Sequence, residues 1–189
     1  MTRHMSNLTV ANQLTLLRML LIPAFVLLVI YAHLGWALAV LFVAGVTDAL
    51  DGLIARRAGQ KTTLGAWLDP MADKLLLTSA FIVLTVPGTT LVNRMPLWLT
   101  VIILSRDIAI VTTVAIVNLA IGPRTFTPSP LGKAATALYV ATALIFMIFN
   151  YLETHSPILD LFVYASAAIT IVSSLHYITH AARIVNHAD

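Results

Sequence analysis

Long runs of apolar residues, separated by short polar connectors, dominate the chain. Six of these runs approach the roughly 20 residues that a helix needs to cross the hydrocarbon core of a bilayer. The connectors between them contain glycine, proline and polar residues, which are typical of turns. The pattern predicts membrane-spanning helices near residues 14–33, 36–57, 70–90, 97–121, 132–151 and 157–182.

The segment before the first run is shorter and less apolar. Residues 5–13 mix a few apolar side chains with Ser, Thr, Asn and Gln, which suits a short helix lying in the membrane interface. We therefore predict an all-α integral membrane protein with six transmembrane helices and a short N-terminal interfacial helix. No repeat or low-complexity tract is visible, and we expect residues 1–189 to form a single membrane domain. The first apolar run is too long for the core of a secretory signal peptide, so we expect no such peptide.

The composition agrees with a membrane protein. Of the 189 residues, 59% are hydrophobic and 10% are charged, whereas a soluble domain has about 25% charged residues. The mean hydropathy is +0.93. The chain contains no cysteine, which excludes disulfides and thiolate metal sites. The net charge of +3 is too small to indicate nucleic-acid binding.

Basic residues are concentrated on one side of the predicted bundle. Six spans place both termini on the same side, and nine Lys and Arg residues fall there, against Arg94 on the opposite side and Arg106 inside the fourth span. Because cytoplasmic loops carry the excess of Lys and Arg, both termini are predicted to be cytoplasmic. The nine are Arg3, Arg18, Arg56, Arg57, Lys61, Lys74, Arg124, Lys133 and Arg183. The aromatic residues near the opposite ends of the spans are Tyr31, Trp36, Trp98 and Tyr151.

Four of the eight acidic residues lie between positions 48 and 73. Asp48 and Asp51 share one helix face, and so do Asp69 and Asp73 on the next helix, where Pro70 is tolerated in the first turn. The two helices are joined by a short loop, so we expect them to be antiparallel and to bring the two pairs together at the cytoplasmic surface. Carboxylates are costly beside hydrocarbon and indicate a working site. Two Mg²⁺ or Mn²⁺ ions would relieve their mutual repulsion.

Small and basic residues accompany the four acids. Gly52 and Ala55 leave room on the acidic face for a bulky ligand, and Arg56 offers a planar fork that matches phosphate oxygens. Gly65, at the opening of the third helix, offers backbone N–H groups to an anion. Together these residues suit a metal-bound diphosphate, and displacement at phosphorus is the chemistry that such a site performs best. A carboxylate that is not fully used by metal can act as the general base.

The run from Asp48 to Asp73 contains every fixed position of the pattern D-x2-D-G-x2-A-R-x8-G-x3-D-x3-D. In this it resembles the CDP-alcohol phosphotransferases, also called CDP-alcohol phosphatidyltransferases, which are integral membrane enzymes of phospholipid synthesis. Residues 12–18, 68–74, 105–107 and 131–133 are similar to segments of the phosphatidylglycerophosphate synthases and the CDP-diacylglycerol-dependent cardiolipin synthases in this family.

The resemblance implies six transmembrane helices, usually in a homodimer, with a polar cavity open to the cytoplasm. It assigns two divalent ions, Mg²⁺ or Mn²⁺, to Asp48, Asp51, Asp69 and Asp73. It assigns the general base to Asp73. It assigns the CDP moiety to Gly52, Ala55, Arg56 and Gly65. The implied reaction moves a phosphatidyl group from CDP-diacylglycerol to an acceptor hydroxyl and releases CMP.

The acceptor is less well defined, and the best candidates are glycerol 3-phosphate and phosphatidylglycerol. Arg106 lies within a span and is expected to face the cavity, so it could hold an acceptor phosphate together with Lys133 and Arg18. Alternatively, Arg106 forms a structural ion pair with a motif acid, and Lys133 is only a cytoplasmic anchor. A pair between Arg106 and Asp107 is disfavoured, because adjacent helix positions diverge. Asp107 resembles the cardiolipin synthase branch slightly more than the glycerophosphate branch.

Two other function classes stay open at this stage. An intramembrane prenyltransferase also binds diphosphate through Asp-x2-Asp and Mg²⁺, but it generally has two separate Asp-rich motifs, and here the acids form one hairpin. A divalent-cation transporter would place its carboxylates near the bilayer midplane, often in two repeated halves. Here the acids cluster at one surface, and Arg56 would repel a cation.

Overall fold

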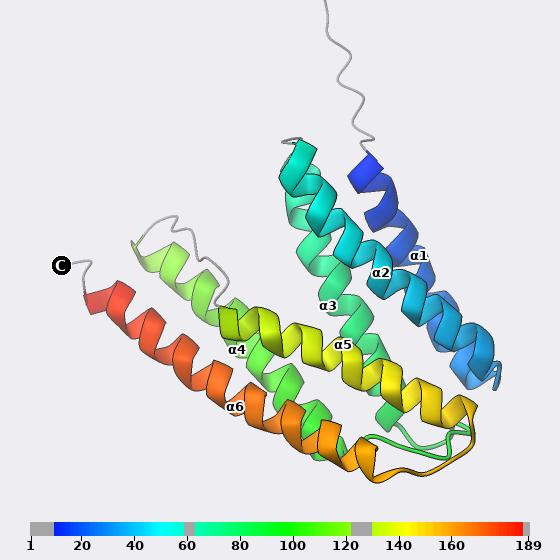
Figure 1. The fold of residues 1–189 in the computed structure, drawn as a ribbon. Coiled ribbons are helices and arrows are strands. Elements are labelled where there is room, and N and C mark those ends of the chain that lie inside the picture. The colour runs from blue at the N-terminus through cyan, green and yellow to red at the C-terminus, as the bar shows by residue number, and fades with distance from the viewer. Residues whose placement is uncertain (1–9, 59–62, 122–129, 187–189) are drawn as a thin grey trace, which may run out of the picture.

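The computed structural model describes the backbone of residues 10–58, 63–121 and 130–186, all of it in six helices and their connections (Figure 1). Side chains between Asp48 and Asp73 lie outside the described part, as do some near the ends of α1, α4 and α6. The helices are α1 (Val10–Ile30), α2 (Leu34–Ala58), α3 (Thr63–Thr85), α4 (Leu97–Ile121), α5 (Pro130–Tyr151) and α6 (Pro157–Asn186).

The observed helices match the predicted six in order and, apart from both ends of the third, lie within four residues of the predicted ends. The third helix ends at Thr85 rather than at residue 90, ahead of the turn residues Pro87 and Gly88. We expected the third helix to begin at Pro70, but α3 begins at Thr63. Hydropathy marks only the part of a helix that can lie in hydrocarbon, and the first turns of α3 are more polar. Pro70 therefore lies inside α3, where its nitrogen has no N–H to donate to the carbonyl of Ala66. Residues 10–13, expected in a separate interfacial helix, form the first turn of α1, and residues 5–9 lie outside the described part.

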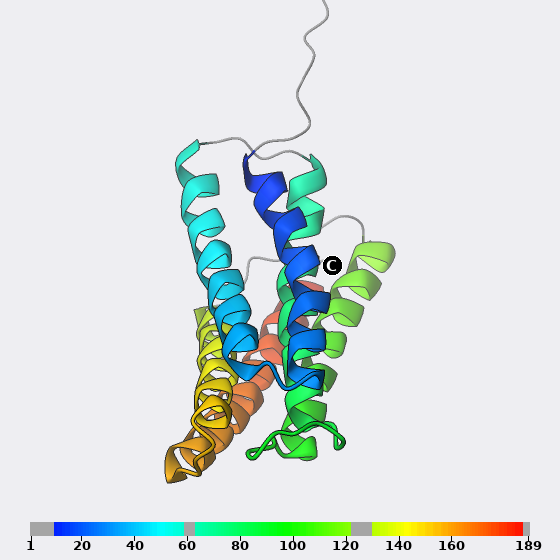
Figure 2. The same ribbon diagram turned by 90° about the vertical axis from the view of Figure 1, so that its right-hand side faces the viewer.

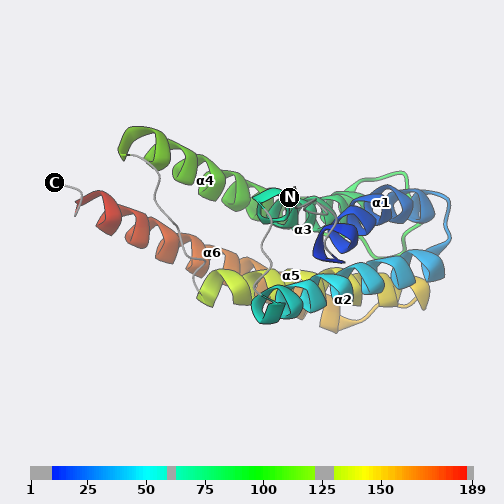
Figure 3. The ribbon, with the colours of Figure 1, turned by 90° about the horizontal axis from the view of Figure 1, so that it is seen from above.

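The helices fall into two groups that separate toward one end of the molecule. The connections at residues 31–33, 86–96 and 152–156 lie together at the lower end in Figures 1 and 2. From there α1, α2 and α3 run upward, whereas α4 and α6 extend away from them, as the view from above also shows (Figure 3). Helix α5 joins the groups, because it packs on α2 and α3 as well as on α6.

Small residues allow the helices to approach one another closely. Ala80 of α3 and Ala135 and Ala143 of α5 are completely buried. A Cβ atom placed on Gly45 of α2 would lie 3.7 Å from Cγ1 of Val140 on α5. Close backbone approach of this kind is typical of helix packing in membranes, where lipid tails provide little hydrophobic driving force between helices.

Hydrogen bonds between buried side chains connect α5 to α6. The hydroxyl groups of Tyr139 and Thr170 lie 2.6 Å apart, and those of Thr142 and Ser166 lie 2.8 Å apart. All four side chains are at most 2% exposed. A hydroxyl group transferred to apolar surroundings needs such a partner, so these pairs fix the position of α6 along α5.

A second set of polar contacts ties the two groups together near the lower connections. Thr85 of α3 and Thr100 of α4 lie 2.6 Å apart through their hydroxyl oxygens. The Asn93 backbone N–H donates to the side-chain oxygen of Asn150 (2.8 Å), and the Asn150 amide donates back to the Asn93 carbonyl (2.9 Å). The Asn93 side chain also donates to the carbonyl of Thr154. The connection between α3 and α4 is therefore fastened to the end of α5.

The outside of the described bundle is largely apolar. Large hydrophobic side chains on every helix are exposed, for example Leu20, Phe42, Ile108 and Leu161. Two helical stretches, Pro130–Tyr151 and Pro157–Thr179, are long and apolar enough to cross a membrane, and only 33% of each is buried. An apolar surface of this extent fits a lipid environment better than water. Six spans remain a prediction.

The predicted aromatic belt coincides with the lower connections. Tyr31 directly follows α1, Trp36 and Trp98 lie at the starts of α2 and α4, and Tyr151 ends α5. All four side chains are exposed, as residues at a membrane interface would be.

The Asn93–Asn150 contact can be tested by substituting Asn150 with leucine, which has a similar volume. We expect the change to cost about 2–4 kcal/mol, because the N–H and C=O of Asn93 lose their partners inside an apolar bundle. The measurement is the melting temperature of the detergent-purified protein, and Thr179→Val on the exposed side of α6 is the control. An unchanged melting temperature in Asn150→Leu would show that the contact contributes no stability.

Candidate active site

The buried stripe of α2 leads to the first acidic pair. Ala37, Leu41 and Ala44 are at most 3% exposed and follow a spacing of four and then three residues. This spacing keeps side chains on one helix face. Continuing the same alternation along α2 leads to Asp48, Asp51 and Ala55. These three positions continue the helix face that is buried in the first half of α2, at Ala37, Leu41 and Ala44.

The second acidic pair has the same relation to α3. Leu76, Ala80 and Leu84 are at most 5% exposed and are spaced by four residues. Three residues before Leu76 lies Asp73, and four residues before that lies Asp69. Both acidic pairs thus take register positions that continue the buried stripes of α2 and α3. Their side chains, with those of Arg56 and the neighbouring motif residues, lie outside the described part.

The two pairs also lie at matching depths. Helices α2 and α3 are antiparallel, as predicted, and their joined ends lie at the upper end in Figure 1. Asp48 lies ten residues before the end of α2, and Asp73 lies ten residues after the start of α3. Asp51 lies seven residues before the end of α2, and Asp69 lies six residues after the start of α3. With a rise of about 1.5 Å per residue, each level on α2 has its counterpart on α3.

The other motif positions belong to the same end of the molecule. Gly52 and Arg56 lie in the last two turns of α2, and Gly65 is the third residue of α3. Arg18 lies on α1, which packs against both helices, and its side chain is 1% exposed. The backbone therefore gathers all the motif positions around the upper ends of α1, α2 and α3.

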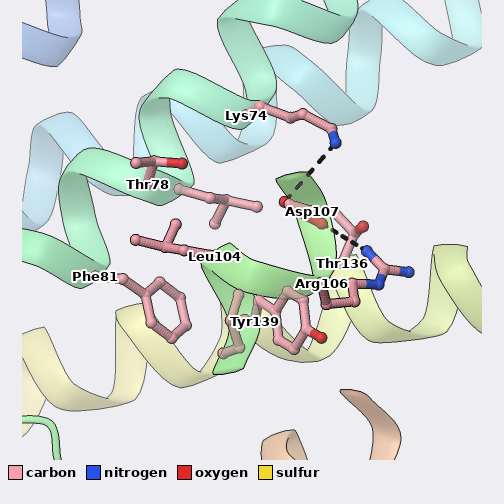
Figure 4. Close-up of a pocket in the computed structure, with 10 residues that line it drawn as sticks. Lys74, Thr78, Phe81, Leu104, Arg106, Asp107, Thr136 and Tyr139 are labelled. Carbon is pink, nitrogen blue, oxygen red and sulfur yellow. Dashed lines mark hydrogen bonds and ion pairs between the residues drawn. The ribbon is translucent and has the colours of Figure 1, made fainter. Parts of the chain in front are cut away.

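A cavity of about 280 Å³ lies between α3, α4 and α5 (Figure 4). Its lining begins at Lys74, the residue after Asp73, so the cavity lies next to the end of the acidic stripe. The lining comprises Lys74, Leu77, Thr78, Phe81, Ile103, Leu104, Arg106, Asp107, Thr136 and Tyr139. It is charged at the end near Lys74 and apolar around Phe81.

Asp107 lies between two cations in this cavity (Figure 4). Nη1 of Arg106 donates to Oδ1 of Asp107 at 2.8 Å, and Nζ of Lys74 lies 3.9 Å from Oδ2. Our expectation that Arg106 and Asp107 would not pair was wrong. Their backbone positions do diverge, but the long Arg side chain folds back to its neighbour, because a charge in apolar surroundings needs a partner.

A sequence model of the CDP-alcohol phosphatidyltransferase family matches residues 8–179. The chain belongs to the CDP-alcohol phosphatidyltransferase family. This finding agrees with the resemblance carried by the Asp48–Asp73 motif, and it decides against the prenyltransferase and transporter alternatives.

Several relatives carry one of two names. A putative cardiolipin synthase of Mycobacterium tuberculosis is 40% identical over 133 residues, which are 68% of this chain and 59% of that protein. A probable phosphatidylglycerophosphate synthase of the same species is 33% identical over 184 residues, 92% of this chain and 81% of that protein. Human cardiolipin synthase (CMP-forming) is 33% identical over 189 residues, 89% of this chain and 61% of that protein. The chain thus spans about three fifths of the length of these two cardiolipin synthases.

Several residues that line the cavity in this family member were not predicted as site residues from the sequence. Of the three predicted acceptor residues, Arg106 lines it, whereas Arg18 is on α1 and Lys133 is exposed at the start of α5. The structure adds Lys74, Thr136 and Tyr139. The sequence did contain a signal for Lys74, because a Lys inside a predicted span is energetically costly, as Arg106 is, and therefore indicates a functional position. Thr136 and Tyr139 had none, since they reach the cavity through the packing of α5 on α3.

The matched depth of the acidic pairs can be tested with cysteine pairs, because the chain has no cysteine of its own. We expect Asp48→Cys with Asp73→Cys to be joined efficiently by a short bismaleimide reagent in membranes, since the two positions lie at one level. Asp48→Cys with Gly65→Cys is the control, because its positions differ by eight residues, or about 12 Å, in depth. Mobility on denaturing gels after proteolysis in the connecting loop reports the cross-link. Equal yields from both pairs would contradict the register.

Proposed function

We propose that the protein transfers the phosphatidyl group of CDP-diacylglycerol to an acceptor hydroxyl and releases CMP, as a step in phospholipid synthesis. The observation that carries the proposal is the placement of the two acidic pairs. Their positions continue the buried stripes of α2 and α3, at matching depths, on antiparallel helices of a member of the CDP-alcohol phosphatidyltransferase family.

The donor set fits a divalent metal centre. Four carboxylates at one end of two helices that both pack on α1 offer oxygen ligands, which Mg²⁺ and Mn²⁺ prefer. Among the described side chains no group of three or more metal-binding residues occurs, and the proposed ligands fall outside that part. Asp48, Asp51, Asp69 and Asp73 would hold two ions, which supply charge stabilisation at the diphosphate when bound.

The remaining motif residues would bind and orient the CDP moiety. Gly52 and Ala55 carry little or no side chain, so a nucleotide can approach the α2 backbone. The guanidinium of Arg56 would pair with the diphosphate oxygens, and the N–H groups at the start of α3, around Gly65, would donate hydrogen bonds to an anion.

The reaction needs one proton acceptor. The acceptor hydroxyl oxygen forms a bond to the phosphorus of the phosphatidyl group, and the bond from that phosphorus to the CMP phosphate oxygen breaks. The hydroxyl proton passes to the carboxylate of Asp73, and CMP leaves. Asp73 suits this role because it is followed directly by Lys74, the first lining residue of the adjacent cavity.

The acceptor is either glycerol 3-phosphate or phosphatidylglycerol, and the names of the relatives support both. Arg106, with Lys133 and Arg18 as further candidates, would attract its phosphate. We place the active site and both termini on the cytoplasmic side of a bacterial-type cytoplasmic membrane, because basic positions gather at the acidic end of the bundle and Arg94 lies at the other. We also expect the protein to be a homodimer, as the family resemblance implies.

The role of Asp73 can be tested by Asp73→Asn, which keeps the shape but removes the base. We expect release of CMP from CDP-diacylglycerol, in the presence of Mg²⁺ and either acceptor, to fall by about 10²–10⁴-fold. Asp160→Asn in the first turn of α6, at the far end of the molecule, should keep the wild-type rate. Comparable CMP release by Asp73→Asn and wild type would rule out this residue as the base.

The role of Arg56 can be tested by Arg56→Lys, which keeps the charge but loses the planar fork. We expect the affinity for CDP-diacylglycerol to fall about tenfold without loss of expression, because an ammonium group cannot pair with two phosphate oxygens in the same way. Arg57→Lys, one residue further along α2, is the matched control. Wild-type affinity in Arg56→Lys would remove Arg56 from the diphosphate site.

A further inference from the structure

Three charged side chains line the cavity between α3, α4 and α5. Lys74 and Arg106 are cationic, and the carboxylate of Asp107 contacts both. The other lining residues are neutral. At neutral pH the charged end of the cavity therefore carries a net charge of +1, because Asp107 cancels one of the two cations.

Arg106 has capacity left for a ligand. Its side chain is 10% exposed, and Asp107 accepts a hydrogen bond from its Nη1 atom. Its Nε atom is buried and has no hydrogen-bond partner among the described residues. A guanidinium has five N–H donors, so an anionic oxygen that enters the cavity would satisfy donors that Asp107 leaves open.

The rest of the cavity suits an apolar group. Phe81 lies seven residues beyond Lys74 on α3, which places it about 10 Å further from the acidic end. Leu77, Ile103 and Leu104 complete this part of the lining, and Phe81 and Ile103 are at most 4% exposed. A ligand that joins a phosphate to the start of a hydrocarbon chain matches both ends of the cavity.

We propose that Asp107 determines the acceptor by setting the charge of this cavity, an inference that rests on the proposed function. A phosphodiester of a lipid with a free hydroxyl carries one negative charge and balances the net charge of +1. A phosphate monoester has a second pKa near 6 and carries close to two negative charges, one more than the net charge of this cavity balances. The cavity therefore favours phosphatidylglycerol over glycerol 3-phosphate.

The test compares kcat/KM for phosphatidylglycerol and for glycerol 3-phosphate, each with CDP-diacylglycerol and Mg²⁺ in one detergent. We expect wild type to prefer phosphatidylglycerol. Asp107→Asn raises the net charge to +2 and should move the preference about tenfold or more toward glycerol 3-phosphate, mainly through KM. Asp107→Glu keeps the charge and should keep the wild-type preference.

Substitution of Lys74 gives a change of opposite sign. Lys74→Gln lowers the net charge to zero and should move the preference further toward phosphatidylglycerol. The double variant Lys74→Gln with Asp107→Asn returns the net charge to +1 and should restore the wild-type ratio, which a purely structural role of Asp107 would not do. Lys74→Gln also tests the idea if Asp107→Asn fails to fold.

The possible failures are distinguishable. If wild type releases no CMP with either acceptor, the proposed function itself fails. If wild type transfers efficiently but prefers glycerol 3-phosphate, or if the ratio is the same in Asp107→Asn, Lys74→Gln and wild type, the function stands and the role of Asp107 is overturned.

Discussion

The cost of an unpartnered polar or charged group in apolar surroundings governs this structure. The outside of the described bundle is rich in exposed Leu, Ile, Val and Phe, so polar side chains in its interior must find partners there. Hydroxyl pairs join α5 to α6, and a reciprocal amide contact fastens the α3–α4 connection to α5. The same requirement explains why Arg106 pairs with its own neighbour. Few polar residues lie inside, and most of those described have an identifiable structural partner.

The same rule explains why the fold was largely predictable. A run of about 20 apolar residues has few alternatives to a spanning helix, so the six helices and most of their ends follow from the chain. The start of α3 did not follow, because its first turns, from Thr63 to Asp69, are too polar for a hydropathy criterion although they are helical. The separation of the two helix groups was also beyond the sequence, since it depends on which faces of α3, α4 and α5 pack together.

The candidate site, too, was only partly predictable from the sequence. The prediction that the acids of each pair share a helix face follows from spacing alone, because residues three or four apart lie on the same side of any helix. The cavity beside them does not, since Asp107 and Tyr139 reach it from helices that are distant in sequence. The error about Arg106 and Asp107 has a simple origin. The prediction considered only the directions of the two Cα–Cβ bonds, whereas the Arg106 side chain is long enough to fold back toward Asp107.

The two polar ties between the helix groups lie at one end of the molecule. The Thr85–Thr100 and Asn93–Asn150 contacts hold the groups at the lower connections. Asp69 lies 16 residues before Thr85 on α3, which is about 24 Å away along the helix. A tilt of α3 by ~5° about Thr85 would displace its acidic end by ~2 Å for that length of helix. A displacement of that size is comparable to a metal–ligand bond. Packing at the remote end of the bundle is therefore expected to affect the spacing of the two acidic pairs.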